Sequence, residues 1–213
     1  MKYSVILVAG GQGTRMGLGY NKVFYPLGEG QTVLDKALGL YKNDARCAQI
    51  IIVTNPNDLQ RTALEYEAGR IVNVSGGKTR QDSVFSALMA VTEDTVLIHD
   101  AARPYTPQSV IDNILSALET ESAAVPVIPV HYTIKETTEG YIDGTLNRSI
   151  LRHAQSPQGF KTELFLRCLH KARLERFEAE DDAHVVETFS DLKIKIVDGS
   201  FDNIKITTLD DIR

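Results

Sequence analysis

Short apolar runs rich in β-branched residues recur along this 213-residue chain, and helix-length segments separate most of them. Because the runs lack the polar alternation of a half-exposed strand, they predict strands that are covered on both faces. Such strands alternating with helices predict a Rossmann-like α/β fold, with a mainly parallel twisted sheet between two helical layers. The expected strands are residues 4–8, 50–54, 71–74, 96–99, 124–130 and 194–197, and the clearest helices are residues 32–41, 58–67, 80–91, 107–119 and 162–172.

One stretch departs from this rhythm. Residues 130–158 are polar and rich in turn signals, with Glu-Gly at 139–140 and Asp-Gly at 143–144. We interpret residues 131–153, approximately, as a β-arm that protrudes from the sheet. An arm with apolar residues commonly grips a second subunit, which predicts a homodimer. The rest of 1–213 is expected to be a single domain.

Two of the expected helices begin with cap sequences. The helix near residue 58 opens with Asn57-Asp58, and the helix near residue 107 opens with Thr106 followed by Pro107. Side-chain oxygens at the N-cap and proline at the first helical position are both favoured at helix starts.

Charge and cysteine content exclude several classes of protein. The formal net charge is -5, which argues against a broad basic surface for duplex nucleic acid, so any anion site must be local. Cys47 and Cys168 belong to no metal-ligand spacing and are expected to be packed, reduced thiols. No run approaches the roughly 20 apolar residues that cross a bilayer. We therefore expect a cytoplasmic protein.

A glycine-rich loop follows the first expected strand directly. Residues 7–17 read Leu-Val-Ala-Gly-Gly-Gln-Gly-Thr-Arg-Met-Gly, and such a loop can bring backbone N–H groups onto phosphates without interference from Cβ atoms. A dinucleotide-binding fingerprint would need glycine at Met16, and the partial Walker A match at residues 77–79 would need glycine at Val72. Neither NAD nor a P-loop site is predicted.

The glycine loop carries two cations beside it. Arg15 ends the loop and Lys22 follows shortly after. A triphosphate and an incoming phosphomonoester repel one another, so attack on the α-phosphorus needs concentrated positive charge and usually Mg²⁺. Arg15 and Lys22 would meet that need; the alternative is a surface turn with two solvated basic residues.

A second glycine motif joins a strand to a helix. Residues 75–83 contain Gly76-Gly77, which would let a flat base pack against the backbone, and Ser83, which could hydrogen-bond the edge of that base. The alternative is a tight turn in which Asp82 and Ser83 cap the helix. Arg80 lies in the same motif, and we expect it to be solvated or paired on its helix.

A third motif, His99-Asp100 followed by Arg103, lies at the end of a buried strand, where ligands bind in open α/β sheets. Asp100 could hold Mg²⁺ or a polyol hydroxyl, since carboxylate oxygens suit both. Arg103 is expected to pair locally and shape the loop. His99 is expected to be a packed, hydrogen-bonded structural residue.

Taken in order, these motifs resemble the 2-C-methyl-D-erythritol 4-phosphate cytidylyltransferase family of the non-mevalonate isoprenoid pathway. The resemblance covers nearly the whole chain and implies a fold of the nucleotidyltransferase type. It also implies transfer of CMP from CTP to the polyol phosphate with release of pyrophosphate. The matching segments are Ala-Gly-Gly-x-Gly-x-Arg-Met-Gly at 9–17, Asn-Lys at 21–22, Gly-Gly-x-x-Arg-x-Asp-Ser-Val at 76–84, His-Asp-Ala-Ala-Arg-Pro at 99–104, Asn-Arg at 147–148 and Asp-Asn-Ile-Lys at 202–205.

The resemblance also implies roles for individual residues. Four cations would act in catalysis, two on the triphosphate and two on the substrate phosphate. Backbone and small residues would bind the nucleotide, and polar residues would bind the polyol phosphate, with Asp100 also facing the metal. The catalytic set is Arg15, Lys22, Arg148 and Lys205; the nucleotide-binding set is Val8, Ala9, Gly10, Gly11, Gly13, Gly76, Gly77 and Ser83; the substrate-binding set is Asp100, Arg103 and Thr133.

In that family the arm reaches a neighbouring molecule, so Thr133 and Arg148 would serve the partner's site. The chain departs from the family at Tyr132, where aspartate is usual. It departs again at residues 180–183, where threonine commonly precedes an acidic pair; we interpret this segment as a helix start, with a solvated acidic turn as the alternative.

Two other functions remain open from the sequence. The nearest is a cytidylyltransferase for ribitol 5-phosphate or another polyol phosphate, which would share the fold and most of the cations. The segment at 99–104 favours the methylerythritol enzyme, and Tyr132 weakens that preference. The other is a nucleotide-binding module without catalysis. The cations at both the leaving and the attacking group argue against it.

Overall fold

The computed structural model describes residues 1–213 apart from 12, 14, 15, 67 and 213. Its main sheet has eight strands in the order β10-β7-β11-β6-β1-β4-β5, with β12 on β7. The pairs β1–β4, β1–β6, β4–β5 and β7–β12 are parallel, and β10 and β11 run antiparallel to their neighbours. The strands are β1 (Tyr3–Val8), β4 (Cys47–Thr54), β5 (Ile71–Ser75), β6 (Thr95–Asp100), β7 (Ala123–Pro129), β10 (Arg152–Ala154), β11 (Gln158–Lys161) and β12 (Lys195–Asp198).

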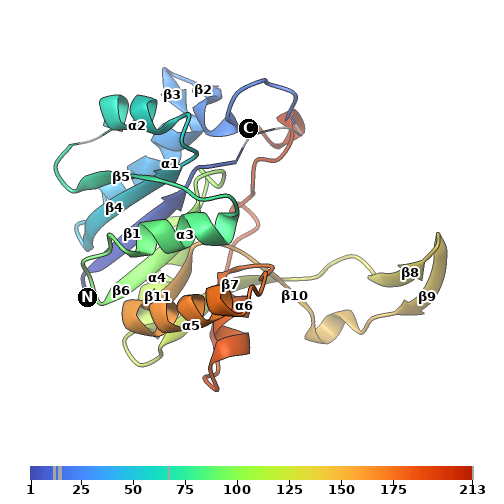
Figure 1. Ribbon diagram of the computed structural model, residues 1–213. Helices are drawn as coiled ribbons and strands as arrows, with labels where there is room; N and C mark the ends of the chain where they lie inside the picture. Colours follow the sequence, from blue (N-terminus) through green and yellow to red (C-terminus); the bar gives the residue numbers. More distant parts are fainter. Residues whose placement is uncertain (12, 14–15, 67, 213) are drawn as a thin grey trace.

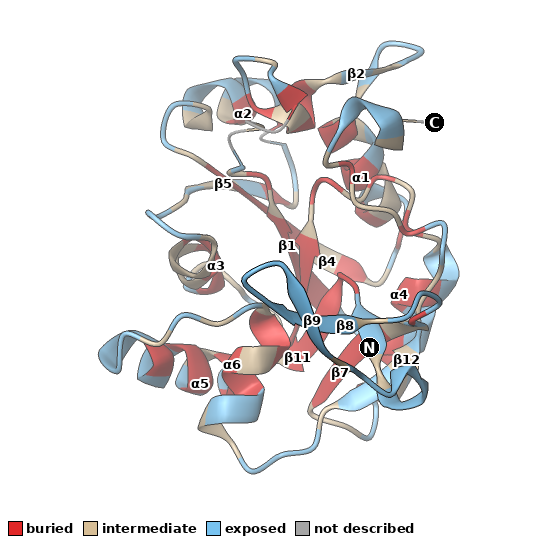
Figure 2. Ribbon diagram, turned by 90° about the vertical axis from the view of Figure 1, so that its right-hand side faces the viewer, coloured by how far each residue is buried: buried red, intermediate tan, exposed pale blue. Residues whose placement is uncertain are grey.

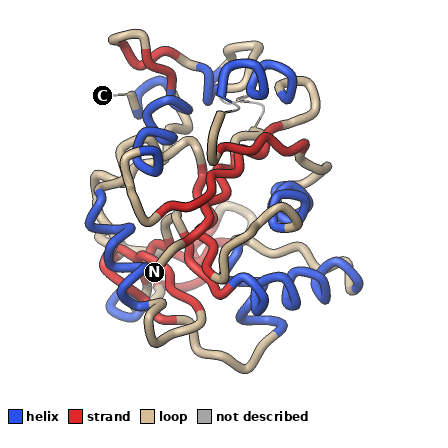
Figure 3. Tube along the Cα trace, turned by 90° about the vertical axis from the view of Figure 1, so that its left-hand side faces the viewer, coloured by secondary structure: helices blue, strands red, loops and turns tan. Residues whose placement is uncertain are grey.

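Helices cover both faces of this sheet (Figure 3). In β1, Val5 and Leu7 pack with α1 and α4 on one face, while Ile6 packs with α3, α5 and α6 on the other. All three side chains are fully buried, which is why this strand shows no polar alternation. No helix of the described residues is long and apolar enough to span a membrane. The helices are α1 (Val33–Lys42), α2 (Leu59–Tyr66), α3 (Arg80–Leu88), α4 (Gln108–Ala117), α5 (Thr162–Leu174) and α6 (Asp182–Phe189).

A hairpin of β8 (Lys135–Thr138) and β9 (Tyr141–Thr145) projects away from the sheet (Figure 1). Its turn places Glu139 and Gly140 at φ 50° and 86°, as the turn sequence predicts. Figure 2 shows the hairpin almost entirely exposed, in contrast to the buried strands behind it. The chain returns through η3 (Arg148–Ile150) to β10. The protruding arm is therefore present, and its role in dimerisation stays a prediction.

Short elements follow the glycine loop and close the chain. The turn η2 (Lys22–Phe24) begins at Asn21, whose side chain accepts from the Val23 amide, and it leads into a small antiparallel pair. These elements lie beside the carboxyl end of the main sheet. The remaining bounds are β2 (Pro26–Gly28), β3 (Gln31–Thr32) and η4 (Leu209–Asp211).

The expected secondary structure differs from the structure at β11, at the start of α4 and at Asp143-Gly144, which lies within β9 and not in a turn. Strand β11 was not among the expected elements, because Gln-Gly-Phe-Lys is too short and mixed to indicate a buried strand. The helix start expected at residues 180–183 is confirmed, since α6 begins at Asp182 and the Asp181 side chain accepts from the His184 amide as its N-cap. Thr106 does not cap α4; Pro107 occupies the N-cap position without a side-chain bond. The Thr106 hydroxyl instead donates to Asn203 Oδ1 at 2.8 Å, tying two distant segments together.

Candidate active site

A pocket of about 370 Å³ opens at the carboxyl ends of the parallel strands. Val8 ends β1, Asp100 ends β6, and the turn after β5 supplies a third wall. Strand ends meet here because β1, β4, β5 and β6 all run in the same direction. The described residues that line the pocket are Val8, Gly10, Gly11, Lys22, Val23, Gly77, Lys78, Thr79, Arg80, Ser83, Asp100, Ala102 and Lys205.

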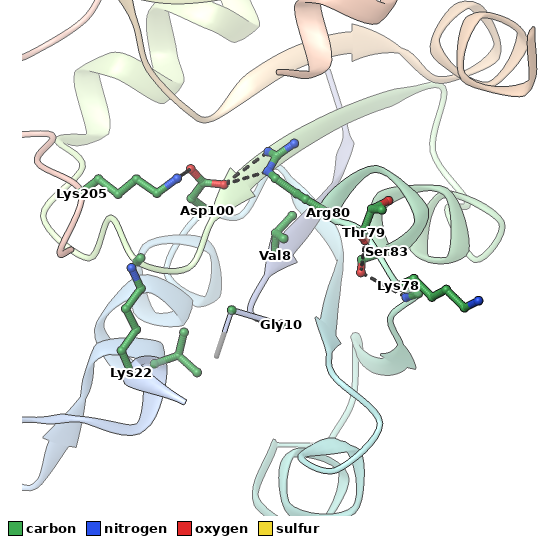
Figure 4. A pocket seen from close by; sticks show the side chains of 13 residues that line it. Val8, Gly10, Lys22, Lys78, Thr79, Arg80, Ser83, Asp100 and Lys205 are labelled. Carbon is green, nitrogen blue, oxygen red and sulfur yellow. Dashed lines mark hydrogen bonds and ion pairs between the residues drawn. The ribbon is translucent and has the colours of Figure 1, made fainter. Parts of the chain in front are cut away.

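Asp100 lies at the centre of a cluster of cations (Figure 4). Its Oδ2 accepts from Lys205 Nζ at 2.7 Å, and its Oδ1 lies 3.3 Å from both Nε and Nη2 of Arg80. Burial alone would raise the pKa of Asp100, but the charges of Arg80 and Lys205 outweigh it and hold the pKa well below its usual range. Asp100 is therefore a carboxylate at any physiological pH.

Arg80 is held from its other side by Asp182. The two guanidinium nitrogens Nη1 and Nη2 donate to Asp182 Oδ1 and Oδ2 at 2.9 and 2.7 Å, a two-pronged pair that fixes the plane of the guanidinium. Asp182 is buried at the start of α6. The expectation that Arg80 is solvated or paired on its own helix was wrong, because the folded chain brings Asp100 of β6 and Asp182 of α6 against the start of α3. The sequence did hold a signal that Arg80 belongs to the site, since it follows two glycines and lies in the first turn of a capped helix.

Lys22 enters the same pocket from the glycine-loop side. Its Nζ donates to the Ile206 carbonyl at 2.6 Å, next to Lys205 in the chain. Figure 4 shows Lys22 reaching toward the side of the pocket where Lys205 contacts Asp100. Lys22 and Lys205, far apart in the sequence, therefore line the same pocket. Such an arrangement suits a ligand that carries several negative charges.

The Gly76-Gly77 turn is packed tightly against α3. A Cβ at Gly76 would lie 2.7 Å from Ser83 Oγ and 2.9 Å from the Thr54 carbonyl, and a Cβ at Gly77 would collide with Asp82. The Gly77 amide donates to Ser83 Oγ at 3.1 Å. Helix α3 is capped by Thr79 and Asp82. Of the two residues that the capping alternative named, Asp82 therefore caps the helix and Ser83 does not. Close packing explains both glycines, and their contact with a base stays a prediction.

The structure brings most of the predicted site residues to one place. Gly13 has φ 65°, where a side chain would be strained, and a Cβ there would lie 3.0 Å from the Lys22 amide nitrogen. Ala9 is buried beneath the loop, and its amide donates to the Val53 carbonyl. Arg15 lies outside the described residues. The predicted residues that line the pocket are Val8, Gly10, Gly11, Lys22, Gly77, Ser83, Asp100 and Lys205, while Gly76 lines an adjoining groove.

Thr133 and Arg148 do not reach this pocket within one chain. Both are exposed, at the base of the arm and in η3, and Arg148 Nη1 donates to the His131 carbonyl. Neither belongs to the described lining. A role for them in catalysis therefore requires the arm to meet a second copy of the chain.

Arg103 shapes the loop after β6. Its Nη1 donates to the Asn203 carbonyl at 2.7 Å, and its buried Nε has no hydrogen-bond partner and lies 4.0 Å from Asp100 Oδ2. It does not belong to the described lining of the pocket. The expected local pairing is thus present, and contact with substrate stays a prediction.

His99 is fully buried between Tyr41 and Thr106. The Tyr41 hydroxyl lies 2.6 Å from Nδ1 and the Thr106 hydroxyl 3.2 Å from Nε2. Because Thr106 donates its proton to Asn203, we infer that Nε2 carries the hydrogen and Nδ1 accepts from Tyr41. Burial lowers the pKa of His99 to about 3. The histidine is structural, as expected.

This buried histidine predicts a pH effect on stability. The unfolded imidazole gains a proton near pH 6.5 while the folded one stays neutral, so stability is full above that pH and falls as the pH drops towards the folded pKa. We expect the free energy of unfolding to be about 1 kcal/mol lower at pH 5.5 than at pH 6.5. Urea titrations at the two pH values measure this difference, and an NMR titration of His99 near pH 6 in the folded protein would contradict it.

The fold and the pocket define an α/β nucleotide-binding protein of the nucleotidyltransferase type: a glycine loop after β1 and paired cations meet at the carboxyl edge of a parallel sheet. Residues 3–213 match the family described as 2-C-methyl-D-erythritol 4-phosphate cytidylyltransferase. The chain belongs to this family.

Relatives and solved structures agree along nearly the whole chain. The enzyme of that name from Bacillus thuringiensis is 35% identical over 215 residues, covering 99% of this chain and 94% of the relative. The corresponding protein of Geobacillus kaustophilus is 35% identical over 217 residues, covering 100% and 94%. The crystal structure of the Thermus thermophilus enzyme is similar with a TM-score of 0.84 at 31% identity, covering 100% of this chain and 96% of that one.

Proposed function

We propose that this protein transfers CMP from CTP to 2-C-methyl-D-erythritol 4-phosphate, giving the CDP-linked polyol and pyrophosphate. Membership of the family supports the reaction. The structural observation that carries it is the convergence of Lys22 and Lys205 on one pocket at the carboxyl edge of the sheet. Its described lining has four cations, namely Lys22, Lys78, Arg80 and Lys205, against the single carboxylate of Asp100. This surplus of positive charge fits two anionic substrates.

The geometry supports direct transfer without a covalent enzyme intermediate. An oxygen of the polyol phosphate attacks the α-phosphorus of CTP, a new P–O bond forms, and the bond to the β-phosphate breaks to release pyrophosphate. The nucleophile is already an anion, so no general base is required. The task of the protein is to hold two repelling groups in line and to stabilise the charge that spreads over the phosphoryl oxygens. We propose Lys22 and Lys205 for this role, because both line the pocket.

We further propose that Mg²⁺ accompanies CTP. No group of three or more acidic, histidine or cysteine side chains that could hold a metal occurs among the described residues. Asp100 is the one carboxylate in the described lining, and it is engaged by Lys205 and Arg80. This donor set fits Mg²⁺ held mainly by phosphate oxygens and water with Asp100 as its protein ligand, since Mg²⁺ commonly binds through one or two carboxylates plus substrate phosphates. The ion would neutralise charge on the leaving pyrophosphate.

A pyrophosphate-release screen tests the reaction. Each nucleoside triphosphate is paired with 2-C-methyl-D-erythritol 4-phosphate and with ribitol 5-phosphate, with and without Mg²⁺. We expect turnover with CTP, the methylerythritol phosphate and Mg²⁺. Rapid use of ribitol 5-phosphate with no turnover of the methylerythritol phosphate would overturn the choice of substrate. The family match does not favour ribitol 5-phosphate.

A homodimer is the functional unit that we propose. Arg148 and Thr133 are exposed on the arm segment, away from the pocket of their own chain. The arm also exposes large apolar side chains, with Tyr132, Tyr141 and Ile150 each more than three-quarters exposed. Apolar surface of this kind marks an interaction site. A second copy that receives the arm would cover this surface and gain Arg148.

Mixing two inactive variants is expected to restore activity. If Arg148 serves the partner's pocket, a mixed dimer of Lys22→Ala and Arg148→Ala contains one site with neither change. Random exchange makes half of the dimers mixed, and half of the sites in them are intact, so about a quarter of wild-type turnover should return. Co-refolding the variants and measuring pyrophosphate release checks this. Absence of any recovery, with dimers verified by light scattering, would place Arg148 in its own chain's site or outside catalysis.

The cellular location is a last proposal. The sequence favours the cytoplasm, where its two cysteines, both free and buried, would stay reduced. Fractionation of cells that produce the tagged protein tests this, and recovery in a secreted or envelope fraction would contradict it.

A further inference from the structure

Lys22 begins the turn η2, and the side chain of the residue before it makes three hydrogen bonds. The preceding residue, Asn21, is only 4% exposed. Its Nδ2 donates to the Ala9 carbonyl at 2.6 Å and to Asp58 Oδ2 at 2.9 Å. Its Oδ1 accepts from the Val23 amide at 3.3 Å and caps the turn η2. The direction in which Lys22 leaves the backbone therefore depends on how the Asn21 amide is oriented.

Asp58 receives amides from two sides. Its Oδ2 accepts from Asn21 Nδ2 and from Asn55 Nδ2, the latter at 2.6 Å. Asn55 in turn accepts from the backbone amides of Asn57 and Asp58, which fixes the tight turn between β4 and α2. Asp58 was expected to act as a helix cap, but its carboxylate bridges this turn and the segment beside the glycine loop.

A second contact joins the same two segments. The guanidinium of Arg61, one turn along α2, lies over the ring of Phe24 with 3.9 Å from Cζ to the ring centroid. Phe24 is buried at the end of η2. Helix α2 buries few of its own side chains, namely Thr62 and Tyr66, so its first turn has a supporting role beyond core packing. Asp58, directly before α2, and Arg61 in its first turn thus contact the two ends of the segment that carries Lys22.

We propose that Asp58 is a positioning residue for the transfer reaction, acting on Lys22 through the orientation of the Asn21 amide. A carboxylate only accepts hydrogen bonds, so it forces the NH₂ group of Asn21 to face it and leaves the amide oxygen to cap η2. Without Asp58, a flipped Asn21 amide would lose fewer hydrogen bonds than it does in the presence of the carboxylate. The turn could then adopt other conformations. This inference rests on the proposed function only for the role of Lys22; the amide geometry stands on its own.

The contribution of Asp58 comes from its shape as an acceptor and not from its charge. A negative charge close to a triphosphate site is unfavourable by itself, so its presence needs another reason. Asp58→Asn keeps an oxygen that can accept from both Asn21 and Asn55, whereas Asp58→Ala removes it. The two variants therefore separate positioning from electrostatics.

Kinetics with CTP and the polyol phosphate give the first test. We expect Asp58→Ala to lower kcat about tenfold with little change in the KM for CTP, because a misplaced catalytic group affects the transition state most. Asp58→Asn should keep kcat within about twofold. Thr62→Val is the matched control, since it removes a buried hydroxyl that donates to the backbone carbonyls of Asp58 and Leu59 and leaves the Asp58 carboxylate in place. It should leave kcat unchanged.

A double variant separates positioning from a general structural effect. If Asp58 acts through Lys22, Asp58→Ala should cause no further loss in a Lys22→Ala background, whereas independent effects would multiply. A second tenfold loss in that background would overturn the proposal. So would a loss of the same size in Thr62→Val.

An NMR measurement is independent of catalysis. The side-chain amide protons of Asn21 should exchange with solvent at least about tenfold faster in Asp58→Ala than in the wild type, and at the wild-type rate in Asp58→Asn. Unchanged exchange in Asp58→Ala overturns the inference whatever the kinetics. A wild-type protein that fails to turn over CTP, with this exchange pattern present, would instead count against the proposed function.

Discussion

Replacing Lys22 by alanine is expected to lower turnover by about 10²–10³, as for the loss of one preorganised group that stabilises developing charge. The lysine lines the pocket and its Nζ rests on the Ile206 carbonyl, beside Lys205. A phosphoryl oxygen that gains charge in the transition state would attract this ammonium more strongly than a neutral carbonyl does. Pyrophosphate release under saturating CTP measures the change.

Lys2→Ala is the matched control for this variant. Lys2 Nζ also donates to a backbone carbonyl, that of Ala45 at 2.7 Å, but it is exposed and does not belong to the described lining of the pocket. Its replacement should leave turnover within about twofold. Equal turnover in Lys22→Ala and Lys2→Ala would remove Lys22 from the mechanism, and with it the main structural support for phosphoryl transfer.

Asp100→Asn is expected to destabilise the protein by about 2 kcal/mol. The change preserves the size of the side chain but leaves the charges of Arg80 and Lys205 without their shared carboxylate. Breaking a fully buried pair costs about 3–5 kcal/mol. We expect less here because the side chains of Arg80 and Lys205 are 36% and 39% exposed, so solvent screens part of the effect. Urea unfolding at pH 7 measures the change.

The same variant should respond more strongly to anions. With Asp100 neutralised, added pyrophosphate can pair with Arg80 and Lys205, so it should raise the Tm of the variant more than that of the wild type. Asp112→Asn is the control, since Asp112 pairs with Arg46 on the surface, where both side chains are at least 40% exposed. It should cost under about 1 kcal/mol. Equal destabilisation by the two changes would show that the ion pairs of Asp100 stabilise the protein no more than a surface ion pair does.

Most of the sheet could be predicted from the sequence. β1 and β4 are runs of apolar residues whose side chains are buried on both faces, and a chain with such runs between helices has few alternatives to a parallel sheet. The arm could also be predicted, because its polar, turn-rich sequence cannot form a core strand. β11 could not, since its Gln158 and Gly159 are buried by partners on both sides that the local sequence does not reveal.

The candidate site was predicted in part. Asp100 could be predicted from its position at the end of a buried strand, and Lys22 from its position just after the glycine loop. Both lie at the carboxyl edge of a parallel sheet, where ligands bind. The residues that hold them were not predicted. Arg80 depends on Asp182 from α6, and Asn21 depends on Asp58 from the β4–α2 turn, and each pairing joins segments whose contact no local pattern indicates.

The sequence by itself determined the layers of the fold, the loop that follows β1 and the cations available for phosphate chemistry, because burial periodicity and glycine placement are local properties. Only the tertiary structure decided which of these cations share a pocket and what each one contacts. Lys205 meets Asp100 and Lys22 meets the Ile206 carbonyl across more than 100 residues of chain. Such contacts depend on the order and direction of whole strands, which sets the positions of side chains that are distant in sequence.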